Sequence, residues 1–420
     1  MIRPAASEER GRGRAPALGL YLLLAVAVVV ARRPDAVLNP QFWAEDGTVW
    51  FADAYNRGLG TLLEPHAGYL ALLPRATALL GQRIGLGHAP QLFNAVALLL
   101  QLAPALFILS RRFETLVPSL GVRCLLGLVY LLIPVAEAHV NLANAQWHLA
   151  VLMCMVVLAA PPRSLAGRLL DVAVLAGGGL TAAVIIVLAP VAVARWLTSR
   201  QRWHGVLAGV AVAAALVQAG TVLANPASRG SAPLGAGVRP LLRVVTDRVV
   251  VPALVGEQNP ALFSIHWWHG LLWAALVACA ALAVAGWAAL RGPWELRLLL
   301  AFGGLGLVLA LLSPLVAPGG DQWQGLVSGD TATRYFLIPT LTFSVAVVWA
   351  VSRLPAPTRR VVAAALAATL VTGVALQLQY PPLIDRHPAT QAATLRAAPS
   401  GAPIDLLLNP AGWHMVLIRH

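Results

Sequence analysis

The chain has 420 residues, of which 59% are hydrophobic and 11% charged, and its formal net charge is +13. Its long runs of Ala, Leu and Val exclude a soluble enzyme and a membrane β-barrel, whose strands would alternate in polarity. All the positive charge comes from arginine, and the arginines are scattered over loops and span ends instead of gathering on one face. We therefore predict a helical protein of the lipid bilayer that binds no nucleic acid.

The N-terminal segment, residues 1–16, is polar and carries four arginines against two glutamates. A basic flank before a first span is typical of the cytoplasmic side, so we predict a cytoplasmic N-terminus. The first span covers about 17–32 and ends at Arg32-Arg33-Pro34. It is expected to be retained because no small-residue cleavage site follows it. A first outer loop over 33–90 comes next.

Part of this loop, 66–88, is apolar but short, and Pro74-Arg75 interrupts it. A full crossing here would place the arginines that follow the next span on the outer side. We therefore predict one or two amphipathic helices that lie in the membrane interface.

Ten further spans are predicted at about 91–110, 121–136, 149–160, two within 168–196, 205–223, 267–290, 298–317, 335–351 and 360–378. The predicted fold class is therefore all-α, a polytopic membrane protein with about eleven transmembrane helices and interfacial helices in its first outer loop. Residues 1–378 form the transmembrane domain, and 379–420 form a short extracytoplasmic tail. Most arginines fall in short inner loops, which supports this orientation.

The first outer loop carries an adjacent pair of acids, Glu45 and Asp46, among four aromatic residues (Phe42, Trp43, Trp50 and Phe51). One interpretation is an interfacial aromatic belt with two solvated acids. The other is a catalytic carboxylate at the membrane surface, where a low-dielectric environment tunes its pKa for general-base work.

Polar residues other than arginine concentrate on the predicted outer side, whereas the inner loops hold little besides arginine. The chain has no Walker-type phosphate loop and no Gly-x-Gly-x-x-Gly after a strand, which argues against ATP and dinucleotides. We therefore expect an extracytoplasmic active site in a bacterial-type plasma membrane.

The second outer loop, 137–148, is rich in polar side chains. Its Glu137-x-His139 pattern, together with His148, has the donor types of a divalent metal site. The alternatives are hydrogen bonds to a sugar and the capping of helices. Substrate contacts are predicted for the polar and aromatic residues of the outer loops: Glu137, His139, Asn141, Asn144, Gln146, Trp147 and His148, with His66 and His266 from other loops. No cofactor beyond this alternative metal ion is predicted.

Arg334-Tyr335 precedes a late span on the outer side. A guanidinium there suits bidentate binding of a phosphate at headgroup depth. The alternative is an arginine that snorkels at the end of a span.

These features together resemble the GT-C superfamily of polytopic glycosyltransferases, which includes the protein O-mannosyltransferases and the aminoarabinose transferases of lipid A. The resemblance rests on Glu45-Asp46 after the first span, the interfacial helices of about 50–88, the polar loop 137–148, and Arg334-Tyr335.

The resemblance implies transfer of a sugar from a polyprenyl-phosphate donor to a hydroxyl of a glycan, lipid or protein, with inversion. It implies that Asp46, or alternatively Glu45, is the catalytic base, with the other acid positioning the acceptor or a metal. Arg334 would bind the donor phosphate, and because the chain lacks lysine, Arg243 or Arg248 would assist it. The alternatives are a transporter or flippase of lipid-linked glycans and a non-enzymatic membrane protein. A transporter would place ionisable residues at mid-span, where this chain has almost none.

Overall fold

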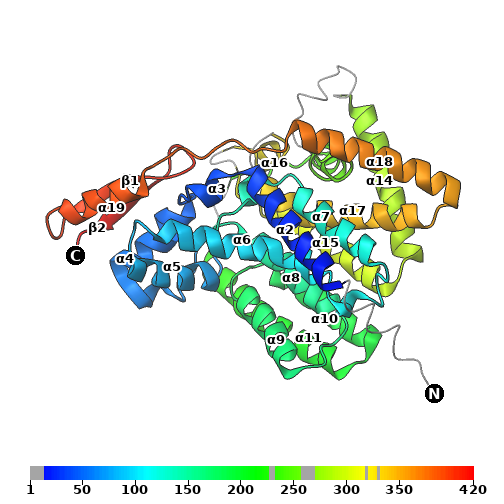
Figure 1. Cartoon of the computed structure of the whole chain (residues 1–420), viewed down its shortest axis with the longest axis horizontal. Coiled ribbons are helices and arrows are strands. Elements are labelled where there is room, and N and C mark those ends of the chain that lie inside the picture. Colours follow the sequence, from blue (N-terminus) through cyan, green and yellow to red (C-terminus); the bar gives the residue numbers. More distant parts are fainter. Residues whose placement is uncertain (1–13, 227–231, 257–269, 317–319, 329–331) are drawn as a thin grey trace.

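The computed structural model describes residues 14–226, 232–256, 270–316, 320–328 and 332–420. These residues form a predominantly helical bundle with a smaller unit at one end (Figure 1). Six of the described helical segments are long and apolar enough to cross a membrane: α6 (Ala89–Phe107), α11 (Arg202–Ala224), α14 (Leu271–Arg291), α15 (Trp294–Leu312), α17 (Leu337–Ser352) with the preceding turn η8 (Thr333–Phe336), and α18 (Ala356–Leu376). The prediction of a helical integral membrane protein is confirmed.

Five shorter helices complete the bundle: α2 (Arg14–Arg32), α7 (Leu120–Leu132), α8 (Ala145–Leu158), α9 (Leu165–Gly179) and α10 (Ile185–Ser199). Each of the eleven predicted spans therefore coincides with a helix, and α9 ends at the glycine run where a bend was expected. How many of these helices cross the membrane stays a prediction.

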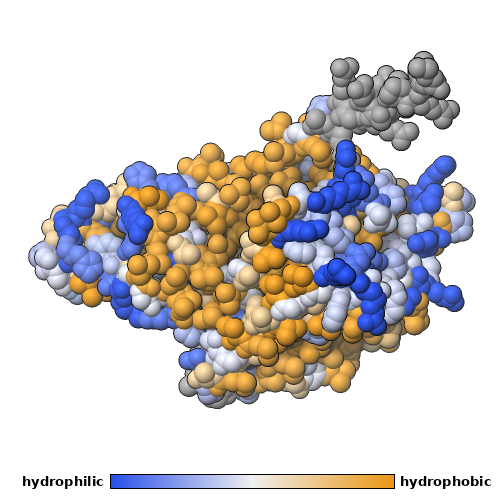
Figure 2. Space-filling view, turned by 90° about the horizontal axis from the view of Figure 1, so that it is seen from below, coloured by the Kyte–Doolittle hydropathy of each residue, from blue (hydrophilic) through white to orange (hydrophobic). Residues whose placement is uncertain are grey.

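A broad apolar belt covers the bundle between two hydrophilic ends (Figure 2). Leucine side chains of its outer helices, including Leu216, Leu272 and Leu282, are more than half exposed. Exposed leucines in such number are stable in hydrocarbon and costly in water, so the belt is the surface that contacts lipid.

Buried arginines satisfy carbonyl groups that are left without intrahelical partners at helix C-termini. The Arg32 guanidinium donates to the carbonyl of Leu132 at 2.8 Å, at the end of α7. Arg112 donates to the carbonyl of Ala160 at 2.6 Å, just beyond α8. Guanidinium is suited to this position because the C-terminal end of a helix carries partial negative charge. Many arginines of this chain therefore act inside the fold.

The first outer loop folds into short elements: α3 (Asp35–Leu38), the π-helix η1 (Asp46–Phe51), α4 (Ala52–Arg57), η2 (Gly58–Thr61) and the amphipathic helix α5 (Leu72–Ile84). The predicted interfacial segment 66–88 thus begins as a turn, in which His66 and Tyr69 exchange two backbone hydrogen bonds. Its position in the membrane interface stays a prediction.

Short elements also connect the later helices: η3 (Arg111–Phe113), η4 (Ala136–Ala138), α12 (Val238–Arg243), η6 (Val244–Val250), α13 (Val251–Val255) and α16 (Gln322–Val327).

The tail packs against the first outer loop at one end of the bundle (Figure 1). It contains α19 (Pro388–Ala397) and the strands β1 (Pro403–Leu407) and β2 (His414–Ile418), which pair antiparallel with Asp405 opposite Val416. The all-α prediction lacked this hairpin. Leu408 and Leu417 of the tail join Phe42, Phe51 and Phe93 in one buried cluster, so loop and tail share a core.

Candidate functional site

The acidic pair lies where the first outer loop is held by the tail. Ala44 donates a backbone hydrogen bond to the carbonyl of Asn409 at 2.5 Å, and the Thr48 hydroxyl donates to the carbonyl of His414 at 2.6 Å. Gly47 packs so closely on Leu408 that a Cβ there would lie 2.6 Å from a Leu408 methyl carbon. The position of Glu45 and Asp46 is therefore fixed from both sides of the loop.

Asp46 is fully buried. Its Oδ2 accepts hydrogen bonds from the backbone N–H groups of Trp43 at 3.4 Å and Leu142 at 3.3 Å, whereas Oδ1 has no partner in the described structure. Burial, and then the charge of Glu45, raise the pKa of Asp46 well above its ordinary value, although the backbone donors oppose this. Asp46 thus joins the first outer loop to the second.

Glu45 is half-buried, and within the described ranges its carboxylate has neither a hydrogen-bond donor nor a salt bridge. Electrostatic interactions nevertheless link it to Asp46, to Tyr69 and to Arg334. Of the two acids, Glu45 is therefore the one whose oxygens are free to accept a proton.

Two tyrosines lie beside this carboxylate. The Tyr69 hydroxyl accepts a hydrogen bond from the Gln146 amide at 3.0 Å, and burial raises the pKa of Tyr69. Trp147 packs edge-on against the ring of Tyr335, with 5.3 Å between ring centroids. Tyr335, Glu45 and Arg334 all act electrostatically on Tyr69.

Arg334 pairs with Glu137. Its Nη1 donates to the Glu137 carboxylate, and Nη2 donates to the carbonyl of Leu315 at 3.0 Å. The hydroxyl of Thr333 accepts the backbone N–H of Glu137 at 3.3 Å, which ties the two loops together. Both side chains of the pair keep about one fifth of their surface exposed, at 22% for Arg334 and 17% for Glu137.

Strained backbone positions mark the same loops. Non-glycine residues with positive φ occur at Ala44 (45°), Ala67 (49°), Val140 (47°) and Ala332 (65°). Each adopts a left-handed conformation that costs about 1–3 kcal/mol and persists only where the surrounding structure determines it. Ala44 directly precedes Glu45, and Ala67 and Ala332 each stand two residues before Tyr69 and Arg334. The surrounding packing therefore imposes strained conformations on the backbone next to Glu45, Tyr69 and Arg334.

A divalent metal ion was one of the alternatives for Glu137, His139 and His148, and it stays a prediction. The described residues contain no cluster of three or more His, Cys, Asp or Glu side chains able to hold a metal ion. His139 binds Gln101 at 3.0 Å and the carbonyl of Val29 at 2.9 Å, and burial lowers its pKa well below the ordinary value. His148 binds the Tyr130 hydroxyl at 2.6 Å and the carbonyl of Ala138 at 3.0 Å. The ring nitrogens of both imidazoles are thus hydrogen-bonded to partners other than the Glu137 carboxylate.

Other predicted substrate contacts instead shape the second outer loop. The amides of Asn141 and Asn144 both donate to the carbonyl of Glu137, at 2.7 and 3.0 Å. Both asparagines are buried, as are His139 and His148. In this structure all four stabilise the loop, and Gln146 and Trp147 are the members of the set that reach the cluster.

The side chains of the remaining predicted residues have other partners. His66 packs edge-on against Trp50 at 5.0 Å between ring centroids, and burial lowers its pKa. Arg243 pairs with Asp247 at 3.3 Å, and Arg248 is buried against the ring of Phe336. His266 falls outside the described residues.

Tyr69 and Thr333 were not predicted from the sequence. Tyr69 was included in a segment interpreted as an interfacial helix, and the adjacent Gly68 was a weak signal for a turn at that position. Thr333 carries no recognisable pattern.

Comparison with known proteins adds no relative, since no family model, curated protein or solved structure matches this chain. The geometry of the site alone carries the functional argument.

Proposed function

We propose that this protein is an inverting membrane glycosyltransferase that moves a sugar from a polyprenyl-phosphate donor to a hydroxyl of a glycan, lipid or protein. The observation that supports the proposal is that a carboxylate without a hydrogen-bond donor in the described structure, Glu45, and a partly exposed guanidinium, Arg334, both act electrostatically on one tyrosine, Tyr69. The proposal includes the GT-C resemblance, the eleven crossings and an extracytoplasmic site in a bacterial-type plasma membrane.

Glu45 is the proposed base in preference to Asp46. A general base must reach within hydrogen-bond distance of the proton that it takes. Asp46 is fully buried and its Oδ2 is occupied by backbone donors, whereas Glu45 is half-buried and unbonded among the described groups. Asp46 then acts as the residue that positions Glu45.

Arg334 is the proposed ligand of the donor phosphate. Its guanidinium already binds a carboxylate, Glu137, and remains partly exposed. A phosphate offers the same bidentate acceptor geometry with more charge, so it can replace Glu137 as the partner. Tyr69 and Gln146, which are hydrogen-bonded to each other, would bind hydroxyl groups of the sugar.

The chemistry is a single displacement. Glu45 takes the proton of the acceptor hydroxyl while that oxygen bonds to the anomeric carbon. The bond from this carbon to the phosphate oxygen breaks, and the electron pair leaves with the lipid phosphate. Arg334 stabilises the charge that develops on this leaving group. The products are the glycoside and the polyprenyl phosphate, and Glu45 returns its proton to solvent.

The test is Glu45→Gln, assayed in membranes for transfer from a radiolabelled polyprenyl-phosphate sugar. General-base catalysis contributes about 10²–10⁴-fold, and the rate is expected to fall by that factor. The matched control is Glu64→Gln, since Glu64 lies in the same loop but pairs with the exposed Arg57 at 2.7 Å. Full activity of Glu45→Gln would overturn the assignment. Loss in Asp46→Asn alone would return the role of base to Asp46.

A second arm tests the phosphate ligand. Arg334→Gln should raise the KM for the donor while leaving the acceptor KM unchanged. An increase confined to the acceptor KM would remove Arg334 from the phosphate site.

A further inference from the structure

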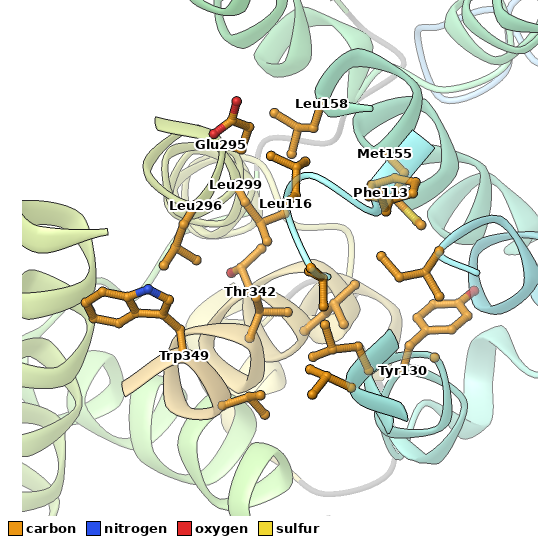
Figure 3. Close-up of a pocket in the computed structure, with 18 of the residues that line it drawn as sticks. Phe113, Leu116, Tyr130, Met155, Leu158, Glu295, Leu296, Leu299, Thr342 and Trp349 are labelled. Atoms are coloured by element: carbon orange, nitrogen blue, oxygen red, sulfur yellow. The ribbon is translucent and has the colours of Figure 1, made fainter. Parts of the chain in front are cut away.

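A second site lies inside the bundle, away from the acidic pair. A cavity of about 390 Å³ opens between α7, α8, α15 and α17. Side chains of all four helices and of the loop before α7 point into it, and Leu116, Leu299 and Thr342 converge on its centre (Figure 3). Its lining is almost entirely apolar, and its volume falls within the range of small-molecule sites, about 300–1,000 Å³.

Polar groups line the cavity mainly at one end. Ser119, Glu295, Ser352 and Arg353 all lie where α7 and α15 begin and α17 finishes. Thr342 lies further along α17, away from this end of the cavity, and its hydroxyl donates a hydrogen bond to the carbonyl of Pro339 at 3.0 Å. Since α17 begins beside Arg334 and has 16 residues, its two ends are separated by about 24 Å. The polar mouth therefore lies at the membrane face opposite to Glu45.

This mouth carries net positive charge. Glu295 is neutralised by Arg195 at 2.6 Å. Arg353 is exposed and lies over the ring of Trp349, 5.3 Å from its centroid, with no carboxylate partner in the part of the chain that the structure describes. A tryptophan beside a cation at a span end is typical of headgroup depth.

The cavity is also accessible from the bilayer. Val122 on α7 and Ser352 on α17 border it and are exposed to the surroundings of the bundle. An apolar cavity does not hold water, and an empty cavity of this size forfeits packing energy. In a membrane, the available molecule that combines an apolar chain with a negative headgroup is an anionic phospholipid.

We propose that this cavity binds one acyl chain of an anionic phospholipid from the membrane leaflet opposite to the Glu45 site, with Arg353 binding the lipid phosphate. The site does not depend on the proposed transferase activity, because it lies at the other end of α17 from Arg334.

The test uses the full chain in nanodiscs of phosphatidylcholine and phosphatidylglycerol in equal parts, with retained lipid counted by native mass spectrometry. We expect one phosphatidylglycerol per wild-type chain. An arginine near the surface contributes roughly a fivefold preference for anionic lipid, and Arg353→Gln should lose it. The matched control is Arg359→Gln, an exposed arginine of α18 that does not line the cavity.

A second pair of variants tests the cavity. Leu126→Trp would fill it, whereas Leu125→Trp adds the same side chain at a neighbouring position that is 47% exposed and outside the lining. Retention should be lost only in Leu126→Trp. Equal retention in these two variants, or equal preference in the two arginine variants, would overturn the proposal. Retention of a polyprenyl phosphate would assign the cavity to the donor chain instead. If Leu126→Trp does not fold, the comparison of Arg353→Gln with Arg359→Gln still tests the proposal.

Discussion

Removal of the Asp46 carboxylate gives the sharpest test of how the first outer loop is held. In Asp46→Ala, the backbone N–H groups of Trp43 and Leu142 lose their acceptor inside a buried site. A buried donor without a partner costs about 1–3 kcal/mol. The substitution also relieves the burial of the unpartnered Oδ1. We therefore expect a net loss of about 2–4 kcal/mol in the free energy of unfolding, near the low end of the sum of the two donors.

Asp46→Asn separates the hydrogen bonds from the charge. Its amide carbonyl can accept from the same two donors, so the loss of stability should stay below about 1 kcal/mol. Both variants are compared with wild type by thermal unfolding in detergent micelles, monitored by tryptophan fluorescence.

The direction of the Asp46 pKa shift determines how the free energy of unfolding changes with pH. Because burial raises the pKa of Asp46 in the folded state, the folded protein keeps this proton to a higher pH than the unfolded chain does. Its contribution to stability is fully present below the unfolded pKa of about 3.9. It is lost as the pH rises towards the folded value, by about 1.4 kcal/mol for each pH unit in that window. Asp46→Asn should lack this slope.

Parallel stability profiles of wild type and Asp46→Asn across this window would refute the reasoning. So would an Asp46→Ala variant that is as stable as Asp46→Asn, because the two hydrogen bonds would then contribute nothing.

Two further substitutions test the packing. Gly303→Ala should lower the free energy of unfolding by about 1–3 kcal/mol, because the new Cβ would lie 2.8 Å from the Cβ of Thr342 on the facing helix. The control is Gly304→Ala, where nothing lies within 4 Å; an equal loss there would contradict the packing argument. Tyr380→Phe should cost about 1–2 kcal/mol, because the Val135 N–H then loses its acceptor at 3.0 Å while the ring still covers Arg32. Increased proteolysis of the tail without cleavage elsewhere is the expected readout, and unchanged proteolysis would argue against this contact.

The helices could be predicted from the sequence because each span is a long apolar run bounded by arginine or proline. A hydrocarbon environment leaves a helix as the stable choice for such a run. The β-hairpin of the tail was less accessible. Its strands have only five residues each, although the Asn409-Pro410-Ala-Gly412 sequence between them indicates a turn.

The sequence predicted which segments form the candidate site but not which of their side chains pair with one another. Glu45, Arg334 and the loop 137–148 do gather at one end, since the predicted outer loops meet there. The partner of Arg334 is Glu137, which is 197 residues away, and no local pattern encodes such a pair. Side-chain burial favours Glu45 over Asp46 as the proposed base, and burial depends on the tail that packs against the loop. The side-chain type of His139 and His148 suggested ligands, but their buried partners, which include Gln101, Tyr130 and backbone carbonyls, could not be predicted from the sequence.

The contact between the first outer loop and the tail has a consequence for biosynthesis. Thr48 and His414 meet across 366 residues, so the ribosome makes the loop long before it makes the segment that covers it. The helices between them can enter the membrane one after another, yet the carboxylate of Glu45 reaches its final surroundings only when the last strand docks. A nascent chain halted before that point would be inserted but incomplete at its acidic pair. Assembly of the site would then follow the insertion of the helices that separate these two segments.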